Sequence, residues 1–592
     1  MRRINERSER VLLACLLSSI MPLSAADNPV NGTPEPAAAK TSPAAQPPSE
    51  IEQLKQMLAD QQRQISELRQ ALTQQQQKKE TDGSVSGSAG SSVIPKVDPA
   101  PVSTFRNLGQ VASTTAILPH SATLPVARAL PAIPLPQAAP NATGSAQNPC
   151  EADPDRTVPT FLRLGSVCIV PIGFMDMTPF WRDKNAGSSM GSNFGSVPYN
   201  NVSNGNLSEL HFSQQNSRIG FRIDGDWKGT HFIGYNEFDF NGTSGATNLA
   251  VSNGAIVPRL RLYWVNAHKG KVEFLAGQSW SMLTPNRNGI SALPGDLFYS
   301  QVIDINYMAG LTWTRQPGLR VLVHPDKHVT FGFAAEQADQ YMGGSAGGSQ
   351  IVLPTNLSTL VSTQLDGGAN ISGASYLGQP TYTPDFIAKL ALDFSRLHFE
   401  VAGVESNFKT TSLAAPFTSH TKAGGGLQFG FNVAVAKNFR LISTNFFSDG
   451  DGRYMFGQAP DVVVRADGSL SPVRSDGTVD GFEARIKNTL LYAYYGGVYI
   501  GRNVTIDTTG KPVGYGYTGS SNSQNRAINE FTFGFNQTLW ASPRYGGINL
   551  MGQYEWLERS PWFVAAGAPK GTHDNTIYMN IRYTLPGGMP SF

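Results

Sequence analysis

The sequence predicts an all-β protein whose main part is an antiparallel transmembrane β-barrel of about 16 strands. Hydrophobic side chains recur at every second position in segments of about ten residues, with polar or small residues between them. The clearest segments are 219–227, 329–335, 427–433, 531–535 and 577–585. Successive side chains of a strand point to opposite faces, so each predicted strand has one hydrophobic and one polar face.

A secretory signal peptide is predicted at residues 1–26. Four arginines within the first ten residues precede the hydrophobic stretch 11–23, and the small residues 24–26 follow it. This order directs a chain out of the cytoplasm. No later window has the roughly 18 uninterrupted apolar residues of a spanning helix. We therefore expect the hydrophobic strand faces to contact outer-membrane lipid and the polar faces to line a lumen.

The composition favours a membrane barrel over a soluble domain or a helical membrane protein. Hydrophobic residues make up 40% of the chain and charged residues only 15%, and the mean hydropathy is −0.22. The net charge of +2 and the dispersed basic residues argue against nucleic-acid binding. The histidines are scattered singly, without metal-ligand spacing or a paired nucleophile, so no enzyme activity, metal or cofactor is predicted.

A short coiled-coil helix is predicted at residues 51–80, after a Pro-, Ala- and Ser-rich segment, 27–50, that is expected to be disordered. Its heptad seam consists of Ile51, Leu54, Leu58, Ile65, Leu68 and Leu72, with Gln61 in the one polar position. A helix of this length is marginal alone, so a trimeric barrel is the expected tether. The alternative is a single amphipathic helix on another surface.

Residues 81–158 are predicted to be a linker, and the barrel is predicted at 159–592. The linker is Gly- and Ser-rich at first and Pro- and Ala-rich later, a composition without a packed core. Cys150 and Cys168 remain after signal removal and could form a disulfide in the oxidising periplasm. The alternative is two free thiols.

The spacing of the strands predicts short turns at the periplasmic end and long loops at the outer end. The predicted turns are 227–230, 269–271, 395 and 437–438, and the predicted loops are 183–206, 242–256, 338–383, 448–480 and 505–525. Trp264, Trp280, Trp313, Trp540, Trp556 and Trp562 lie near predicted strand ends. We expect these tryptophans to form girdles at the membrane interfaces.

Several segments carry a family resemblance: 216–227, 235–242, 260–264, 275–281 and 314–320. Together with the predicted coil, they resemble trimeric outer-membrane porins of the DcaP type. The resemblance covers the coil and roughly the first half of the barrel. It implies a sixteen-stranded homotrimer that passes small, often anionic, organic solutes.

The strand phase places arginines in the predicted lumen. If Ile219 and Phe221 face lipid, then Arg218 and Arg222 face inward. By the same parity, outward Leu260 and Leu262 put Arg259 and Arg261 inward. Further candidates for the lumen are Arg287, Arg315, Arg320, Lys389 and Arg582. Guanidinium groups bind carboxylates and phosphates without losing charge, so these residues favour anion passage.

Two acidic residues argue against the prediction that the lumen favours anions. Glu237 and Asp239 face the same lumen if Phe238 and Phe240 face lipid. Paired with the arginines, they would reduce the net field, so a structural salt-bridge network is the alternative. The loop 286–295 is predicted to fold inward and narrow the bore, with an ordinary external loop as the alternative.

The predicted function is passive diffusion of small hydrophilic solutes across the bacterial outer membrane, with anionic organic acids favoured. The predicted coil would then lie in the periplasm. The alternative is a barrel that serves as an anchor, with residues 51–80 binding the cell wall or a periplasmic partner. Conductance separates the two, because an anchor needs no open lumen.

Overall fold

The structure is a computed structural model that describes residues 161–242, 257–297, 301–344, 350–360, 364–367, 383–542 and 545–586. All of them belong to the second of two compact units, Phe105–Phe592. The predicted signal peptide, coiled coil and linker lie outside the described residues. No helix among the described residues is both long enough and apolar enough to cross a membrane.

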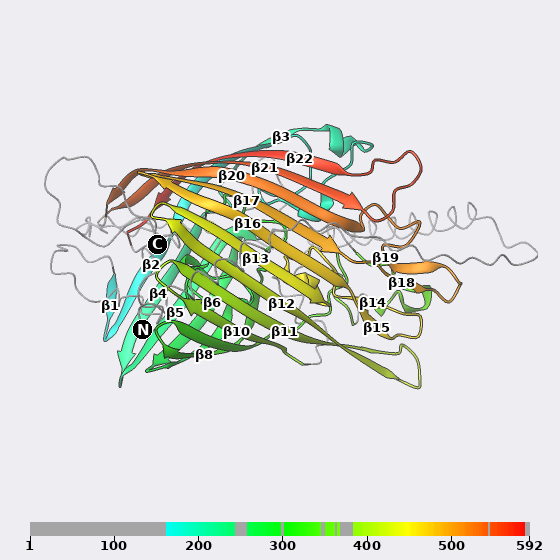
Figure 1. Cartoon of the computed structure of the whole chain (residues 1–592), viewed down its shortest axis with the longest axis horizontal. Helices are drawn as coiled ribbons and strands as arrows, with labels where there is room; N and C mark the ends of the chain where they lie inside the picture. The colour runs from blue at the N-terminus through cyan, green and yellow to red at the C-terminus, as the bar shows by residue number, and fades with distance from the viewer. Residues whose placement is uncertain are drawn as a thin grey trace, which may run out of the picture. The chain divides into compact units, whose positions relative to one another are not determined.

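The described residues form a closed antiparallel β-barrel of 16 strands (Figure 1). In chain order these are β2 (Val167–Arg182), β4 (Arg218–Trp227), β5 (Thr230–Gly242), β6 (Val257–Lys269), β7 (Val272–Trp280), β8 (Arg315–Asp326), β9 (Val329–Glu336), β10 (Asp385–Asp393), β11 (Leu397–Thr411), β12 (Ser419–Ala436), β13 (Phe439–Asp449), β16 (Arg474–Ile486), β17 (Thr489–Ile500), β20 (Asn525–Ser542), β21 (Gly546–Pro561) and β22 (Thr572–Thr584). The predicted fold class is therefore confirmed.

The barrel closes where β2 meets the last strand. Phe174 of β2 pairs with Thr584 of β22, and the pairing continues to Arg182 opposite Thr576. The other edge of β2 pairs first with β4 and then with β3 (Glu209–Ser213). The short strand β1 (Leu162–Leu164) folds back on the start of β2. Closure leaves no open sheet edge, which a strand wall in lipid requires.

Short and long connections alternate around the barrel, as the sequence predicts. Residues 228–229, 270–271, 394–396 and 437–438 form short turns at or next to the predicted positions. In the first turn, Lys228 and Gly229 have φ of 49° and 75°, the left-handed conformation that a tight hairpin requires. One predicted loop, 448–480, is too long, because β13 continues to Asp449 and β16 begins at Arg474.

The long connections contain short elements of their own. These are the hairpins β14 (Val462–Val464) with β15 (Leu470–Pro472) and β18 (Asn503–Ile506) with β19 (Pro512–Tyr515), and the 3-10 helices η1 (Phe194–Ser196), η2 (Ser203–Asn206), η3 (Pro294–Asp296), η4 (Thr355–Leu357) and η6 (Gly452–Tyr454). Both hairpins lie at the right-hand end of the barrel in Figure 1. The first hairpin lies in the loop L6 (450–473) and the second in L7 (501–524), whereas η4 lies in the loop L4 (337–384).

The two faces of the wall differ as the period-two pattern predicts. Large hydrophobic side chains such as Phe221, Phe333 and Phe531 are exposed on the outer face. Between them, polar and charged side chains point inward and are buried. An apolar exterior around a polar interior is typical of a membrane barrel.

A β-bulge in β6 changes which side chains of this strand face inward, so the alternation predicted for residues 259–262 is wrong in part. Glu237 pairs with Leu262 and Phe238 with Leu260, so Arg261 is an extra residue opposite β5. A bulge of this kind breaks the alternation locally. Arg261 and Leu262 are consequently both buried inside, and the prediction that Leu262 faces outward is wrong.

The prediction that the tryptophans form girdles at the membrane interfaces is also partly wrong. Trp264, Trp280 and Trp313 are buried within the barrel and belong to one hydrophobic cluster with residues such as Leu293 and Leu311. Trp540 is exposed, as a girdle residue should be. The interior therefore has its own aromatic core, which a simple two-faced strand pattern does not anticipate.

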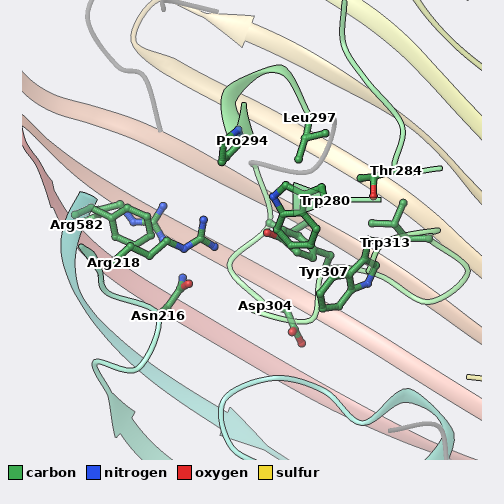
Figure 2. Close-up of a pocket in the computed structure, with 13 residues that line it drawn as sticks. Asn216, Arg218, Trp280, Thr284, Pro294, Leu297, Asp304, Tyr307, Trp313 and Arg582 are labelled. Atoms are coloured by element: carbon green, nitrogen blue, oxygen red, sulfur yellow. The ribbon is translucent and has the colours of Figure 1, made fainter. Parts of the chain in front are cut away.

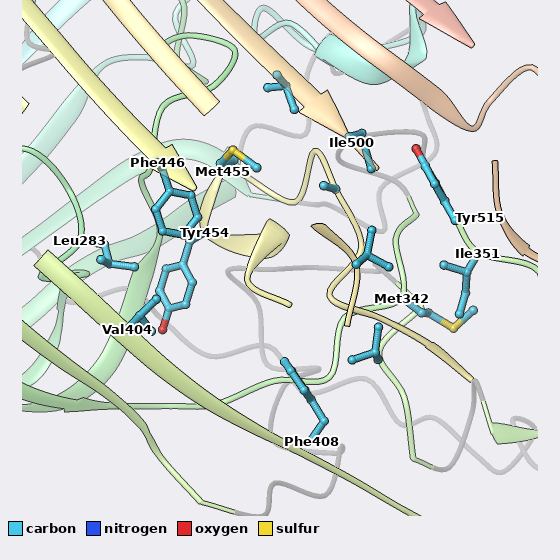
Figure 3. Close-up of a cluster of buried hydrophobic side chains, with 14 of the residues drawn as sticks. Leu283, Met342, Ile351, Val404, Phe408, Phe446, Tyr454, Met455, Ile500 and Tyr515 are labelled. Carbon is cyan, nitrogen blue, oxygen red and sulfur yellow. The ribbon is translucent and has the colours of Figure 1, made fainter. Parts of the chain in front are cut away.

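A second hydrophobic cluster lies inside the barrel at its loop end (Figure 3). Phe408 of β11 and Phe446 of β13 contribute from the inner wall, and residues of L4, L6 and L7 pack against them. Tyr454 and Met455, for example, are completely buried. These loops are therefore folded into the mouth of the barrel.

Candidate pore constriction

The connection between β7 and β8, which we call L3 (281–314), crosses the lumen. Side chains of the inner wall accept hydrogen bonds from its backbone amides. The pairs are Met282 with Glu336 (2.7 Å), Asn286 with Glu400 (3.1 Å), Gly289 with Asp393 (3.1 Å), Ile303 with Gln553 (2.6 Å) and Ala309 with Glu530 (2.7 Å). The inward course predicted for 286–295 is thus present, and it extends to the other described residues of L3, from Met282 to Ala309.

Glycines allow L3 to touch the backbone of the opposite wall. Gly310 has a φ of 79°, and a Cβ there would lie 2.2 Å from the carbonyl oxygen of Gly497. A Cβ on Gly496 would lie 2.3 Å from the carbonyl oxygen of Ala309. No larger residue fits these positions without moving one backbone away from the other.

L3 and the wall of β2, β4 and β22 enclose a cavity with about 590 Å³ of empty space, part of it open to solvent. Figure 2 shows Arg218 and Arg582 together on the wall side, and Trp280, Tyr307 and Trp313 grouped opposite them. Asp304 of L3 also lines the cavity. We call this cavity the constriction, because L3 narrows the lumen here.

The cationic side of the constriction is supported by an aromatic ring. The guanidinium carbons of Arg218 and Arg582 lie 5.3 Å and 3.7 Å from the ring centroid of Phe174. Arg582 is also 3.0 Å from Asp176, and Arg218 is 3.5 Å from Glu237. The cation–π contacts and the two ion pairs hold the arginine side chains in place.

The opposite side of the constriction is an aromatic corner. Tyr307 contacts Trp280 and Trp313 at centroid distances of 5.8 Å and 5.0 Å. Trp313 in turn stacks on Phe456 of L6 at 4.5 Å. Tyr307 and Phe456 have φ of 62° and 56°, an unfavourable conformation for bulky residues that surrounding contacts must maintain.

The arginines predicted on β4 and β6 all have carboxylate partners. Arg222 lies 2.6 Å from Asp224, and Arg259 lies 2.7 Å from Asp239. Arg261 lies 2.7 Å from both Glu237 and Asp239. With the Arg218–Glu237 contact, these pairs form a charged network inside the barrel, so much of the local positive field is balanced.

The other predicted arginines lie around L3. Arg287 is buried and 2.6 Å from Glu483 of β16. Arg320 donates to the carbonyl oxygen of Trp280 at 2.7 Å. Arg315 is buried, and its Nε and Nη1 have no hydrogen-bond partner among the described residues. Its guanidinium carbon lies 5.8 Å from the Trp280 ring centroid, behind the aromatic corner.

The sequence alone missed Asp304, Tyr307 and the inward role of Trp280 and Trp313. Trp280 is the last residue before L3 and Trp313 is the penultimate residue of L3. This position at the two ends of the loop is the signal that could have identified them. Of the predicted residues, the structure places only Arg218 and Arg582 directly on the constriction. The remaining arginines lie in the ion-pair network or beside L3.

The described residues contain no group of three or more His, Cys, Asp or Glu side chains that could hold a metal ion. Cys168 is buried and forms a disulfide. Its predicted partner, Cys150, lies outside the described residues, so that pairing stays a prediction.

No protein-family model matches the sequence, and none of the curated proteins compared with it matches either. The fold is similar to the outer membrane channel DcaP of Acinetobacter baumannii, with 16% identity and a TM-score of 0.51 over 72% of this chain and 99% of that one. OmpF of Salmonella typhi in complex with daunomycin shows 8% identity and a TM-score of 0.39 over 72% and 100% of the two chains. OprB of Pseudomonas putida shows 12% identity and 0.36 over 69% and 93%.

Proposed function

We propose that this chain is an outer-membrane porin through which small hydrophilic solutes diffuse passively. The observation that carries the proposal is a closed barrel with an exposed apolar exterior and a charged interior that L3 narrows to one constriction. The predicted signal peptide and the DcaP-like fold support the same conclusion. A solute would pass between the arginine side and the aromatic corner.

We also propose a preference for anionic organic acids. Two arginines and one carboxylate, Asp304, line the constriction. Asp176 and Glu237, which pair with these arginines, do not line it, so the charge that a solute meets favours anions. Carboxylates accept two parallel hydrogen bonds from one guanidinium group. Arg315, without a carboxylate partner among the described residues, adds positive potential behind Trp280. Arg222, Arg259 and Arg261 contribute less, since they do not line the constriction and their carboxylate partners offset their charge.

The proposed assembly is a homotrimer with the coiled coil of residues 51–80 on the periplasmic side. The support is the heptad seam, which needs partner helices, and the family resemblance of the sequence. Chemical crosslinking of the protein in membranes, with and without residues 51–80, tests the assembly. Dimers and trimers should appear on crosslinking, and loss of the coil should weaken them.

Ion selectivity tests the porin function. The purified protein would be inserted into a planar bilayer under a salt gradient, and its conductance and reversal potential measured. We expect conductance steps and a reversal potential that favours anions. The variants Arg218→Gln and Arg582→Gln should each reduce the preference. Arg526→Gln is the matched control, because Arg526 is exposed at the outer start of β20.

One observation favours the alternative, an anchor without transport. The loops L3, L4, L6 and L7 fill much of the interior with buried side chains. A barrel without conductance under any condition would support the anchoring role. Deleting residues 51–80 should then detach the barrel from the cell wall or from its periplasmic partner. Cation preference in an open channel would instead contradict the role given to Arg218 and Arg582.

A further inference from the structure

A turn of L6, residues 452–458, connects the packed loops with the constriction. The backbone amide of Trp313 donates a hydrogen bond to the carbonyl oxygen of Tyr454 at 2.8 Å. The amide of Gly310 donates to the side chain of Gln458 at 3.2 Å. Together with the Phe456–Trp313 stacking, these contacts make the L6 turn the support of one wall of the constriction.

The base of this turn holds one arginine among several carboxylates, which we call the Arg453 cluster. Its members are Arg453, Asp451 and Asp461 of L6, Asp339 and Asp366 of L4, and Asp385 at the start of β10. Arg453 forms an ion pair with Asp385 and lies 3.0 Å from Asp461 and 3.8 Å from Asp451. All three of these pairs are inaccessible to solvent.

Hydrogen bonds tie the cluster to L4 and to the wall. The amide of Tyr341 donates to Asp461 at 3.2 Å, and Ser406 of β11 donates to Asp451 at 2.6 Å. The hydroxyl of Tyr454 donates to Asp385 at 2.7 Å. The other ionisable groups that act on the cluster are Glu336 of β9, Asp449 of β13 and the phenols of Tyr341 and Tyr454.

The number of carboxylates makes the cluster sensitive to protons. One guanidinium group faces four carboxylates, those of Asp339, Asp385, Asp451 and Asp461, and Asp366 lies near Asp339. Full ionisation would therefore leave several like charges together in a buried space. Burial and the nearby Asp366 raise the pKa of Asp339 to about 7. Burial raises the pKa of Asp461 to about 6, although Arg453 opposes the shift. Burial and Asp461 likewise raise the pKa of Asp451.

The direction of the effect follows from these raised pKa values. A carboxyl group that binds its proton more tightly in the packed cluster stabilises that packing at low pH. The stabilisation decreases as the pH rises through about 6 and about 7, the pKa values of Asp461 and Asp339. The ratio of loosened to packed clusters then increases by up to about tenfold per pH unit for each proton released.

We infer that the Arg453 cluster is a proton-operated latch that regulates flow through the constriction. Loss of protons loosens the L6 turn and removes the support of Phe456 from Trp313, so the constriction widens as the pH rises. The left-handed backbone of Phe456 favours this loosening of the turn, because a strained residue relaxes once the surrounding contacts are lost. This inference rests on the proposed porin function.

The test is single-channel conductance of the full-length protein in planar bilayers between pH 5 and pH 8. Wild-type conductance should rise with a midpoint between about 6 and about 7, the range of the Asp461 and Asp339 pKa values. Asp339→Asn mimics the protonated group and leaves the proton of Asp461 to be released, so the rise in conductance between pH 6 and pH 8 should be smaller than in the wild type. Asp467→Asn is the matched control, since Asp467 is an exposed carboxylate of the same loop, outside the cluster. It should retain the wild-type pH profile.

Hydrogen exchange of residues 452–458 provides a second measurement that does not need conductance. Protection of these amides should decrease from pH 5 to pH 8, after correction for intrinsic exchange, and this decrease should be smaller in Asp339→Asn. A pH-independent conductance, or a wild-type profile in Asp339→Asn, overturns the latch and leaves the porin function intact. Absence of conductance at every pH overturns the porin function instead, and pH-independent protection of the turn then overturns the latch as well.

Discussion

The wall strand β11 and the loop L3 both place side chains in the lumen, but they do so in different ways. Along β11, buried side chains such as Glu400 alternate with outward ones such as Val401. L3 has no such period, and nearly all of its described side chains are buried. The wall therefore needs only the correct type of residue at each position, whereas L3 depends on particular partners. Mutations that separate these two requirements test the comparison.

The largest effect is expected where L3 is bound to the wall by a buried ion pair. Glu483→Gln leaves the buried guanidinium of Arg287 without its charged partner, which costs about 3–5 kcal/mol. Denaturant unfolding in lipid vesicles measures the loss. Asp476→Asn is the control, because its partner Arg474 is largely exposed and the expected cost is within about 1 kcal/mol. Equal losses in both variants would contradict the dependence of L3 on specific partners.

A charge on the outer face tests the rule for the wall. Phe331→Arg places a guanidinium on the exposed face of β9, at a cost of about 2–4 kcal/mol if the site lies at the middle of the bilayer. Phe417→Arg, in the short loop 412–418, should change the stability by less than about 0.5 kcal/mol. The same unfolding assay applies, and a neutral Phe331→Arg would mean that this face does not contact lipid.

The contact between L3 and β17 should respond to a single methyl group. Gly310→Ala introduces a Cβ into the carbonyl oxygen of Gly497 and makes a left-handed backbone less favourable, so L3 must move away from the wall. We expect a loss of about 1–3 kcal/mol in the docking of L3 and a changed conductance with unchanged barrel assembly. Gly567→Ala in the loop 562–571 is the control, with a positive φ but no neighbour within 4 Å of its Cβ.

The smallest effect concerns the disulfide of Cys168, which lies at the edge of the wall. If Cys150 is its partner, Cys150→Ser and Cys168→Ser should produce the same mobility change on a non-reducing gel. Conductance should stay unchanged in both variants, because Cys168 does not line the constriction. Different mobilities would exclude the predicted pairing.

The prediction of the fold succeeded where a local rule was repeated many times. The alternation around Phe221 and Phe333 identified strands and their outer faces, and the turns at 228–229 and 437–438 were located from the sequence. The same rule fails at a single bulge, because the bulge turns Leu262 inward although the hydrophobic pattern of the sequence predicts that it faces outward. Periodicity therefore identifies an element but not its irregularities.

The prediction of the site succeeded only in part, for a related reason. Arg218 and Arg582 follow from strand parity, so the sequence could place them in the lumen. Tyr307, Asp304 and Trp313 belong to L3, whose course depends on bonds to strands distant in the sequence. Trp280 and Trp313 were assigned to a girdle because position near a strand end does not reveal which way a loop turns.

The sequence by itself determined the closed barrel, its outer apolar face and the position of most turns. The physical reason is that the alternation of side chains along a strand is local, and lipid selects the same face in every strand. Only the tertiary structure decided that L3 crosses the lumen, that Arg315 lies behind Trp280, and that L6 supports Trp313. These features arise from contacts between residues far apart in the chain, and no local pattern encodes them.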